Sequence, residues 1–144
     1  MKIEVRTGPW AEQQAVAQAI RYAVFVIEQK IPVELEWDDM DAVCLHAIAF
    51  DEHGQGLGTG RLLPDGHIGR MAVKKNARGA GIGGLLLDAL VKVAQQRGDT
   101  VVKLNAQENA EGFYARHGFS RDGHEFVEAG IPHIGMQRVL STAA

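Results

Sequence analysis

Short runs along the chain either alternate apolar and polar residues or are almost wholly apolar, and both patterns are typical of β-strands. Residues 2–6 alternate, whereas 43–50 is apolar apart from one histidine and predicts a strand buried on both faces. Two further strands are predicted at 57–63 and 67–73, and turn residues rich in Asp, Gly and Pro separate them. Because the links are short, these three strands predict an antiparallel meander.

Longer segments carry apolar residues three or four positions apart, which predicts amphipathic helices. The first helix is expected over about 10–29, with Pro9 near its start and Pro32 as its stop. The second begins at Ile82 and ends at Gly98. Polar residues fall on the opposite side of this second helix, so one side should pack on the protein and the other should face water.

The remaining residues predict a strand at 101–106, a short helix at 108–117 and one or two closing strands from Phe119 onward, including 134–140. The resulting order is β-α-β-β-β-α-β-α-β(-β), which predicts one α/β (α+β) domain over residues 1–144. The strand–helix–strand unit in the middle should place two parallel strands side by side through a right-handed crossover.

Composition narrows the class of protein. The 144 residues are 46% hydrophobic and 23% charged, as in ordinary globular domains, and the net charge of -3 makes a nucleic-acid partner unexpected. The sequence contains no apolar run near the roughly 18 residues that span a bilayer, and its first residues lack the apolar stretch of a signal peptide. The one cysteine, Cys44, cannot form an internal disulfide. We therefore expect a cytoplasmic protein without a membrane partner.

The segment 70–87 is the most informative for chemistry. Within it a strand leads into a basic, glycine-rich turn that opens a helix, Arg78-Gly79-Ala80-Gly81-Ile82-Gly83-Gly84. The first N–H groups of a helix have no partner inside it, and the helix dipole places about half a positive charge there. Glycines let a phosphate approach the backbone, and Arg78 can add a charged contact. The turn is therefore predicted to bind an anion, and a pyrophosphate is its natural ligand.

Other interpretations of this turn remain. Gly79, Gly81 and Gly84 match the dinucleotide-binding pattern G-x-G-x-x-G, but residues 74–78 separate them from their strand, and a meander argues against a doubly wound sheet. A Walker A loop is excluded because no Gly-Lys-Ser/Thr follows. A glycine-rich turn without any ligand would weaken the helix by roughly 1 kcal/mol for each glycine inside it.

Four segments resemble one known family. Residues 78–83 resemble the [Arg/Gln]-x-x-Gly-x-[Gly/Ala] signature of GNAT acyltransferases, and 112–119 is similar to the family's FY-x-x-x-GF segment. Residues 24–29 and 129–133 resemble a bacterial subgroup of predicted acyltransferases in that superfamily. The resemblance covers essentially the whole chain. It implies the GNAT acyl-CoA N-acyltransferase fold, with a mixed central sheet of six to seven strands flanked by helices.

The resemblance also implies acetyl-CoA as co-substrate and no metal. In GNAT proteins the amides of the turn hold the CoA pyrophosphate, the preceding strand pairs with the pantetheine arm, and the two middle strands separate around the thioester. The residues that it assigns to acetyl-CoA are Met71, Ala72, Val73, Arg78, Gly79, Ala80, Gly81, Ile82, Gly83, Gly84, Asn105, Gln107, Asn109, Phe113 and Tyr114. An N–H of Met71 or Ala72 is expected to stabilise the developing oxyanion.

Catalysis by a GNAT protein implies Tyr114 as the general acid for the departing thiolate, a contribution of no more than about 100-fold. An alkyl ammonium costs roughly 4–5 kcal/mol to deprotonate at pH 7, so a base or a desolvated site must assist. The family's usual acid is absent from residues 69–70, and the candidate bases are His67, His133 and Glu28.

An acidic loop follows the first helix and contains Glu34, Glu36, Asp38, Asp39 and Asp41. Two interpretations are open, attraction of a cationic amine and simple solvation. Three of these acids and His46 match no metal site by their spacing, so no metal is expected.

The predicted function is therefore transfer of an acetyl group from acetyl-CoA to a primary amine by direct attack in a ternary complex. The acceptor is expected to be a small molecule or a peptide, and exposed sheet edges leave room for a homodimer. Two alternatives stay open. One is a non-catalytic CoA-binding sensor or interaction module on the same fold, and the other is a nicotinamide-dependent oxidoreductase.

Overall fold

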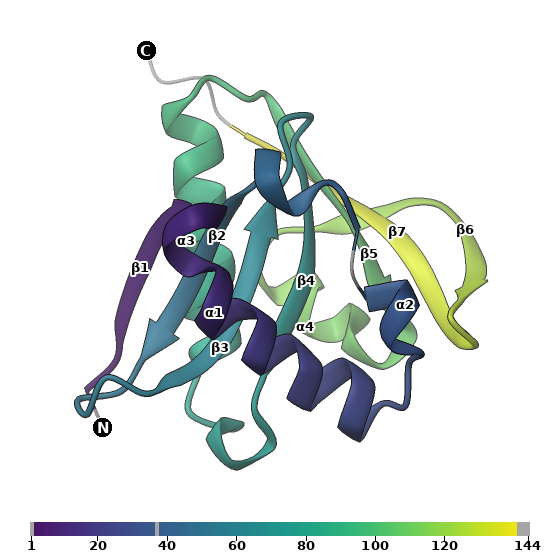
Figure 1. Cartoon of the computed structure of the whole chain (residues 1–144). Helices are drawn as coiled ribbons and strands as arrows, with labels where there is room; N and C mark the ends of the chain where they lie inside the picture. The colour runs from purple at the N-terminus through teal and green to yellow at the C-terminus, as the bar shows by residue number, and fades with distance from the viewer. Residues whose placement is uncertain (1, 37, 141–144) are drawn as a thin grey trace.

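Seven strands form one mixed sheet in the computed structural model, which describes residues 2–36 and 38–140 (Figure 1). The spatial order is β1-β2-β3-β4-β5-β7-β6. The strands are β1 (Glu4–Pro9), β2 (Leu45–Phe50), β3 (Gly56–Leu62), β4 (His67–Val73), β5 (Val101–Gln107), β6 (Ser120–Glu128) and β7 (Ile131–Val139). The predicted α/β class, the antiparallel meander β2-β3-β4 and the parallel pair β4-β5 are confirmed.

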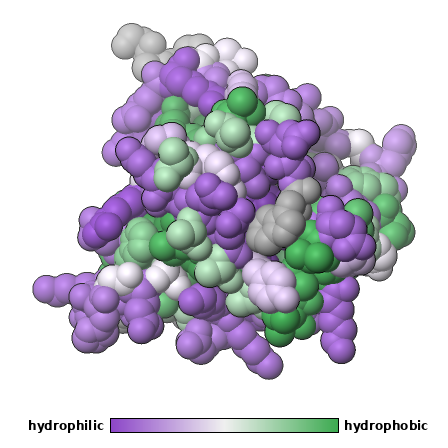
Figure 2. All heavy atoms as spheres, in the orientation of Figure 1, coloured by the Kyte–Doolittle hydropathy of each residue, from purple (hydrophilic) through white to green (hydrophobic). Residues whose placement is uncertain are grey.

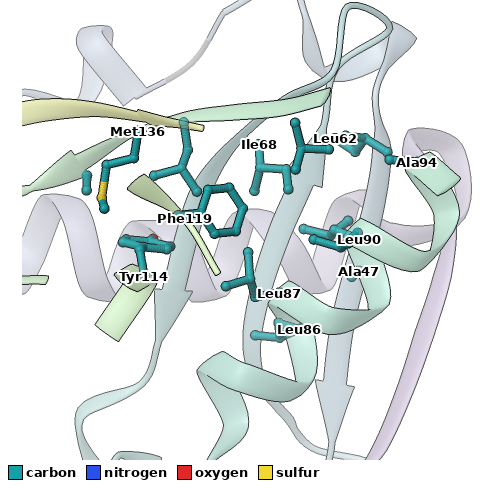
Figure 3. Packing of buried hydrophobic residues seen from close by; sticks show 14 of the residues in the cluster. Ala47, Leu62, Ile68, Leu86, Leu87, Leu90, Ala94, Tyr114, Phe119 and Met136 are labelled. Carbon is teal, nitrogen blue, oxygen red and sulfur yellow. The ribbon is translucent and has the colours of Figure 1, made fainter. Parts of the chain in front are cut away.

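Four α-helices accompany the sheet, and they are α1 (Trp10–Arg21), α2 (Val33–Glu36), α3 (Ile82–Gln96) and α4 (Glu111–Arg116). Helix α1 packs on one face of the sheet, where its Ile20 joins a core cluster with Ile48 and Phe50 of β2. Helices α3 and α4 cover the other face, where Leu87 and Tyr114 join the larger core (Figure 3). None of the described helices is long and apolar enough to cross a membrane.

The prediction of one regular helix over 10–29 is wrong beyond Arg21. Residues 22–28 form a π-helical segment, and the N–H of Gln29 donates to the carbonyl of Val24, five residues earlier, at 3.0 Å. The wider turn shifts the buried stripe to Val24 and Phe25, whereas Ile27, expected on the apolar side, is 62% exposed. Such segments are rare and often mark functional sites.

Two strand predictions also change in detail. Residues 41–43 form a 3-10 turn, so β2 begins at Leu45 and Val43 is exposed. Of the one or two closing strands predicted, two form, and they are joined at Ala129 and Gly130, which both adopt positive φ. The first of them, β6, is exposed along its whole length and forms one edge of the sheet.

Close packing of α3 on the sheet depends on two glycines in β3. A Cβ at Gly58 would lie 2.9 Å from Cδ1 of Leu86, and one at Gly60 would lie 3.0 Å from Cδ1 of Leu90 and only 2.4 Å from the sulfur of Met71. Leu86 and Leu90 are fully buried, and burying a leucine contributes roughly 1.5–3 kcal/mol. The missing side chains therefore let α3 lie close to β3.

Candidate active site

The glycine-rich turn before α3 presents backbone N–H groups that lack partners in the described chain. Gly79 and Gly81 have φ angles of +89° and +77°, which glycine adopts without strain. A side chain at either position would meet no protein atom within 4 Å, so the space beside the turn is open. Among residues 2–36 and 38–140, no acceptor receives a hydrogen bond from the N–H groups of 79–84. These donors lie at the positive end of α3, as an anion site requires.

Gly83 and Gly84 are needed for a different reason. A Cβ at Gly83 would lie 3.4 Å from Cζ of Phe113, and one at Gly84 would lie 3.0 Å from Cε1 of His117. Helix α4 therefore packs directly on the first turn of α3. Only Gly79 and Gly81 border open space, so the expected role of glycine in admitting a phosphate narrows to these two positions.

Arg78 is occupied by a carboxylate in this structure. Its two terminal nitrogens donate to Glu28 at 2.5 and 2.6 Å, and its Nε donates to the carbonyl of Val73 at 3.1 Å. The hydrogen bond from Arg78 holds the pKa of Glu28 below its usual range. A lowered pKa makes a carboxylate a weaker base, so the pairing disfavours Glu28 among the candidate bases.

Strands β4 and β5 separate after two residue pairs. His67 lies opposite Lys103 and Ile68 opposite Leu104, and beyond them each strand pairs only with its other neighbour. The separation coincides with a bulge in β4, where Arg70 adopts a φ of +50°. The gap is what the slot for a thioester requires.

A cavity of about 560 Å³ occupies this gap. It brings together six of the predicted site residues, His67, Met71, Asn105, Gln107, Tyr114 and His133. Ala72 is buried on the α1 side, and Asn109 is exposed in a 3-10 turn before α4 and does not line the cavity. Apolar side chains gather over the π-helical segment and α2 at the rim (green in Figure 2), where Leu35 is 54% exposed. The volume suits a small molecule.

Tyr114 lies at the base of this cavity with its ring in the core. Its ring makes edge-to-face contacts with Phe113 and Phe119, at 5.0 and 6.0 Å between centroids. No hydrogen-bond partner of its hydroxyl is found among the described residues. Burial raises the pKa of Tyr114 to about 12. The hydroxyl therefore keeps its proton at neutral pH, as a general acid must.

The two candidate histidines differ in how they are held. His133 is buried, its Nδ1 lies 2.7 Å from the carbonyl of Ile131, and its ring stacks on Phe126. Because a carbonyl only accepts, Nδ1 is assigned the proton and Nε2 is left as an acceptor. His67 lies where β4 and β5 still pair, with Nδ1 3.0 Å from the carboxylate of Asp65. His133 is therefore the better-oriented of the two.

Comparison with known protein families identifies the family to which a chain with this site belongs. Residues 12–140 match the family model described as an acetyltransferase (GNAT) domain. The chain belongs to the GNAT acetyltransferase family. Its members use acetyl-CoA as co-substrate, so the open donors of the turn and the separated strands are features of an acyltransferase.

Relatives of this GNAT chain are similar over almost their full length. A Bacillus subtilis protein described as an uncharacterized N-acetyltransferase, YjcF, is 38% identical over 130 residues, which are 88% of this chain and 93% of the relative. An acyl-CoA N-acyltransferase structure from Pseudomonas aeruginosa is 33% identical, with a TM-score of 0.86 over 96% of this chain and 100% of the other. Escherichia coli ElaA is 28% identical, with a TM-score of 0.85 over 95% and 99%. The expected fold and family are thereby confirmed.

Simple solvation of the acidic loop in this GNAT domain is wrong for Glu36 and Asp41, which are buried, whereas Glu34 and Asp39 are exposed and attraction of an amine stays a prediction. Three of its acids form an ion-pair cluster with arginines from α1, β3 and β4, and the cluster consists of Arg21, Glu36, Asp38, Asp41, Arg61 and Arg70. Arg21 contacts Glu36 at 2.5 Å and Asp41 at 2.8 Å, and all three side chains are buried. Asp38 accepts two hydrogen bonds from Arg61, at 2.7 and 2.8 Å, which lower its pKa to about 2.

Sequence reasoning missed the arginines of this cluster and Glu128, which also lines the cavity. A signal for Arg61 was present, because it stands within the otherwise uncharged strand 57–63. The burial of Arg21 is harder to predict from sequence. It ends α1, just before the π-helical segment, where the regular helical spacing no longer tells which side of the helix is buried. Glu128 ends the exposed strand β6, and nothing in its sequence context distinguishes it from a surface residue.

Proposed function

We propose that this chain transfers the acetyl group of acetyl-CoA to a primary amine by direct attack within a ternary complex. One observation carries the proposal. The N–H groups of residues 79–84, which have no partner among the described residues, and the gap between β4 and β5 lie along one continuous segment, β4 and its following turn. A molecule with a diphosphate and an extended arm that ends in a thioester fits that arrangement.

The donors at 79–84 would hold the diphosphate of CoA. The open space beside Gly79 and Gly81 admits phosphate oxygens to the backbone. The guanidinium of Arg78 could then bind either the phosphate or the carboxylate of Glu28, which is its partner in this structure. Binding of the anion therefore competes with an existing ion pair.

Bound acetyl-CoA supplies a thioester, and the reaction forms a carbon–nitrogen bond to the amine while the carbon–sulfur bond breaks. Tyr114 would donate its hydroxyl proton to the departing sulfur, because it lines the cavity and remains protonated. An N–H of Met71 or Ala72 would stabilise charge on the carbonyl oxygen, as an oxyanion donor does.

His133 would take the proton that the attacking ammonium loses. Its Nε2 is the free acceptor of the ring, and the residue lines the same cavity as Tyr114. His133→Gln should lower kcat without changing CoA affinity. His124→Gln, on the exposed strand β6, is the matched control and should leave both unchanged.

The deciding experiment measures thiol release from acetyl-CoA with a panel of primary amines, alongside titration of CoA in a calorimeter. The proposal expects CoA binding and amine-dependent release of one thiol per acetylated product, identified by mass spectrometry. Binding without release across the panel would favour a CoA-binding sensor instead. Absence of CoA binding at millimolar concentration would refute both.

A further inference from the structure

Two charged groups at the cavity are only partly satisfied by the protein, and they have opposite signs. Arg70 comes from the bulge in β4, and Glu128 comes from the end of β6. Both line the cavity of about 560 Å³ that also contains Tyr114 and His133. If the proposed function holds, these two side chains face the acceptor.

Arg70 makes only long contacts within the ion-pair cluster. Its nearest recorded acceptors are Asp38 at 3.4 Å, the carbonyl of Leu35 at 3.5 Å and Glu36 at 3.7 Å. The side chain is 28% exposed and lines the cavity, although its Nε is buried and has no hydrogen-bond partner in the described chain. Because its contacts are long, the guanidinium retains capacity for an acceptor that enters the cavity.

The other two arginines of the cluster explain why the acids do not satisfy Arg70. Arg61 takes both oxygens of Asp38 at 2.7 and 2.8 Å. Arg21 takes one oxygen and the backbone carbonyl of Glu36. Both oxygens of Asp38 and one oxygen of Glu36 therefore already accept short hydrogen bonds from other arginines, and Arg70 makes only longer contacts to these acids.

The backbone at Arg70 is strained, which supports a role beyond packing. Its φ of +50° lies in the left-handed region, and a residue with a side chain spends roughly 1–2 kcal/mol to adopt it. Gly69, the preceding residue, is not in this region. Strain of this kind persists at binding sites, where it directs a side chain that the ligand needs.

Glu128 makes no short ion pair within the described residues. Its side chain is 57% exposed, and Nε2 of His133 lies 3.7 Å from its carboxylate. Glu128 precedes the turn at Ala129 and Gly130, where two positive φ angles reverse the chain. The carboxylate is therefore available to a ligand beside the histidine that we propose as the base.

We infer that the acceptor is a zwitterion, a primary amine that carries a carboxylate, with the carboxylate bound by Arg70 and the ammonium attracted by Glu128. A guanidinium binds a carboxylate through two parallel N–H donors, which gives orientation as well as affinity. Phe25, Leu35 and Leu104 line the same cavity and would pack against an apolar side chain. An amino acid with an apolar side chain combines these three features.

Charge balance favours a zwitterion over a simple anion or a diamine. The ion-pair cluster holds three arginines and three acids, so it has no net charge of its own. A simple anion bound at Arg70 would leave Glu128 without a cationic partner, and a diamine would place one ammonium group beside Arg70. A ligand with both charges replaces its water with Arg70 and Glu128 together.

The test compares acceptors that differ only in the carboxylate. Suitable pairs are glycine with methylamine, L-leucine with 3-methylbutylamine and L-phenylalanine with phenethylamine, and β-alanine with ethylamine probes a longer spacing. Acetyl transfer is measured as kcat/KM at saturating acetyl-CoA. The inference expects the acid to exceed its amine by at least tenfold in one or more pairs.

Two substitutions assign the effect to the named groups. Arg70→Gln should lower kcat/KM for the acid by about tenfold to a hundredfold, the usual effect of losing a charged hydrogen bond, and leave the decarboxylated amine unchanged. Glu128→Gln should raise the KM for the amino acid and for its decarboxylated amine alike. Matched controls are Arg6→Gln and Glu125→Gln, whose side chains are exposed and do not line the cavity.

Failure of this inference is distinguishable from failure of the proposed function. Equal or faster transfer to the decarboxylated amines, or an Arg70→Gln effect that is the same for both members, overturns the inference and leaves acetyl transfer intact. Absence of any transfer overturns the proposed function. In that case calorimetric titration of the CoA-loaded protein with each acid and amine still decides the inference, because binding of neither, or no preference for the acid, contradicts it.

Discussion

Two regions of this GNAT domain concentrate polar groups, and they differ in whether those groups have partners within the described protein. The turn before α3 leaves the N–H groups of residues 79–84 without partners in the described chain, and open space adjoins them. The ion-pair cluster joins Arg21, Arg61 and their acids through contacts of 2.5–2.9 Å, and most of it is buried. Open N–H donors thus mark where a substrate should bind, and short ion pairs mark where the chain stabilises its own fold.

The strongest test of this contrast places a negative charge in the open turn. Gly81→Glu should lower CoA affinity at least a hundredfold, because a carboxylate would occupy the space of the diphosphate and repel it. Calorimetric titration of CoA measures the change. Gly54→Glu is the matched control, since Gly54 also has a positive φ of +78° and no neighbour within 4 Å, but lies in the β2–β3 turn. Comparable loss of affinity in both variants would show that the effect is strain alone.

Removing an arginine from the ion-pair cluster should lower the free energy of unfolding and leave CoA affinity unchanged. Arg21→Met removes the cation between Glu36 and Asp41 and leaves two buried carboxylates, which should lower the free energy of unfolding by about 3–5 kcal/mol. Urea denaturation monitored by circular dichroism measures it. Arg6→Met, in an exposed pair with Glu4, should cause no measurable change. A wild-type-like midpoint for Arg21→Met would mean that the cluster does not stabilise the fold.

Tyr114 extends the contrast into the apolar core, because its hydroxyl has no hydrogen-bond partner in the part of the chain that the structure describes. Tyr114→Phe keeps the ring contacts with Phe113 and Phe119 and should lower kcat by up to about a hundredfold. CoA affinity should stay the same. Since burial raises the pKa of Tyr114 to about 12, the acid remains protonated below that pH, and its titration should produce no fall in wild-type kcat between pH 7 and 9. An unchanged kcat in the variant would exclude the acid role.

The smallest expected effect lies between the two regions, at the pair of Arg78 and Glu28. Glu28→Gln should raise CoA affinity about threefold, because it frees Arg78 and removes a negative charge near the turn. The gain should shrink in high salt, since the pair is partly exposed. Glu34→Gln, on the exposed side of α2, is the control. Weaker binding by Glu28→Gln would instead show that Glu28 orients Arg78 toward the ligand.

Local signals predicted most of the fold and the donor side of the site. The alternation of 2–6, the apolar run 43–50 and the glycines around Gly81 each act within a few residues, so the sequence pattern predicts them directly, although β1 is shifted to Glu4–Pro9 and β2 begins only at Leu45. The π-helical segment did not follow from spacing, because Ala23 and Ile27 continue the spacing of a regular helix, yet both are exposed and Val24 and Phe25 are buried in their place.

Contacts between distant residues account for what sequence reasoning could not reach. Arg21 and Asp41 are 20 positions apart, and Arg78 and Glu28 are 50 apart, so neither pair leaves a local pattern. The acidic loop looked solvated because its arginines belong to other elements. The same limit applies to Arg70, whose importance depends on a bulge that only the three-dimensional arrangement of β3 and β4 reveals.

The two positions without side chains in β3 affect more than local packing. Gly58 and Gly60 allow Leu86 and Leu90 of α3 to lie close to the strand, which sets the height of the helix above the sheet. The N–H groups of residues 82–84 belong to the first turn of the same helix, so a methyl group added at either glycine should push these donors away from the strand. Space inside one strand thus bears on the geometry of a turn that lies outside the sheet.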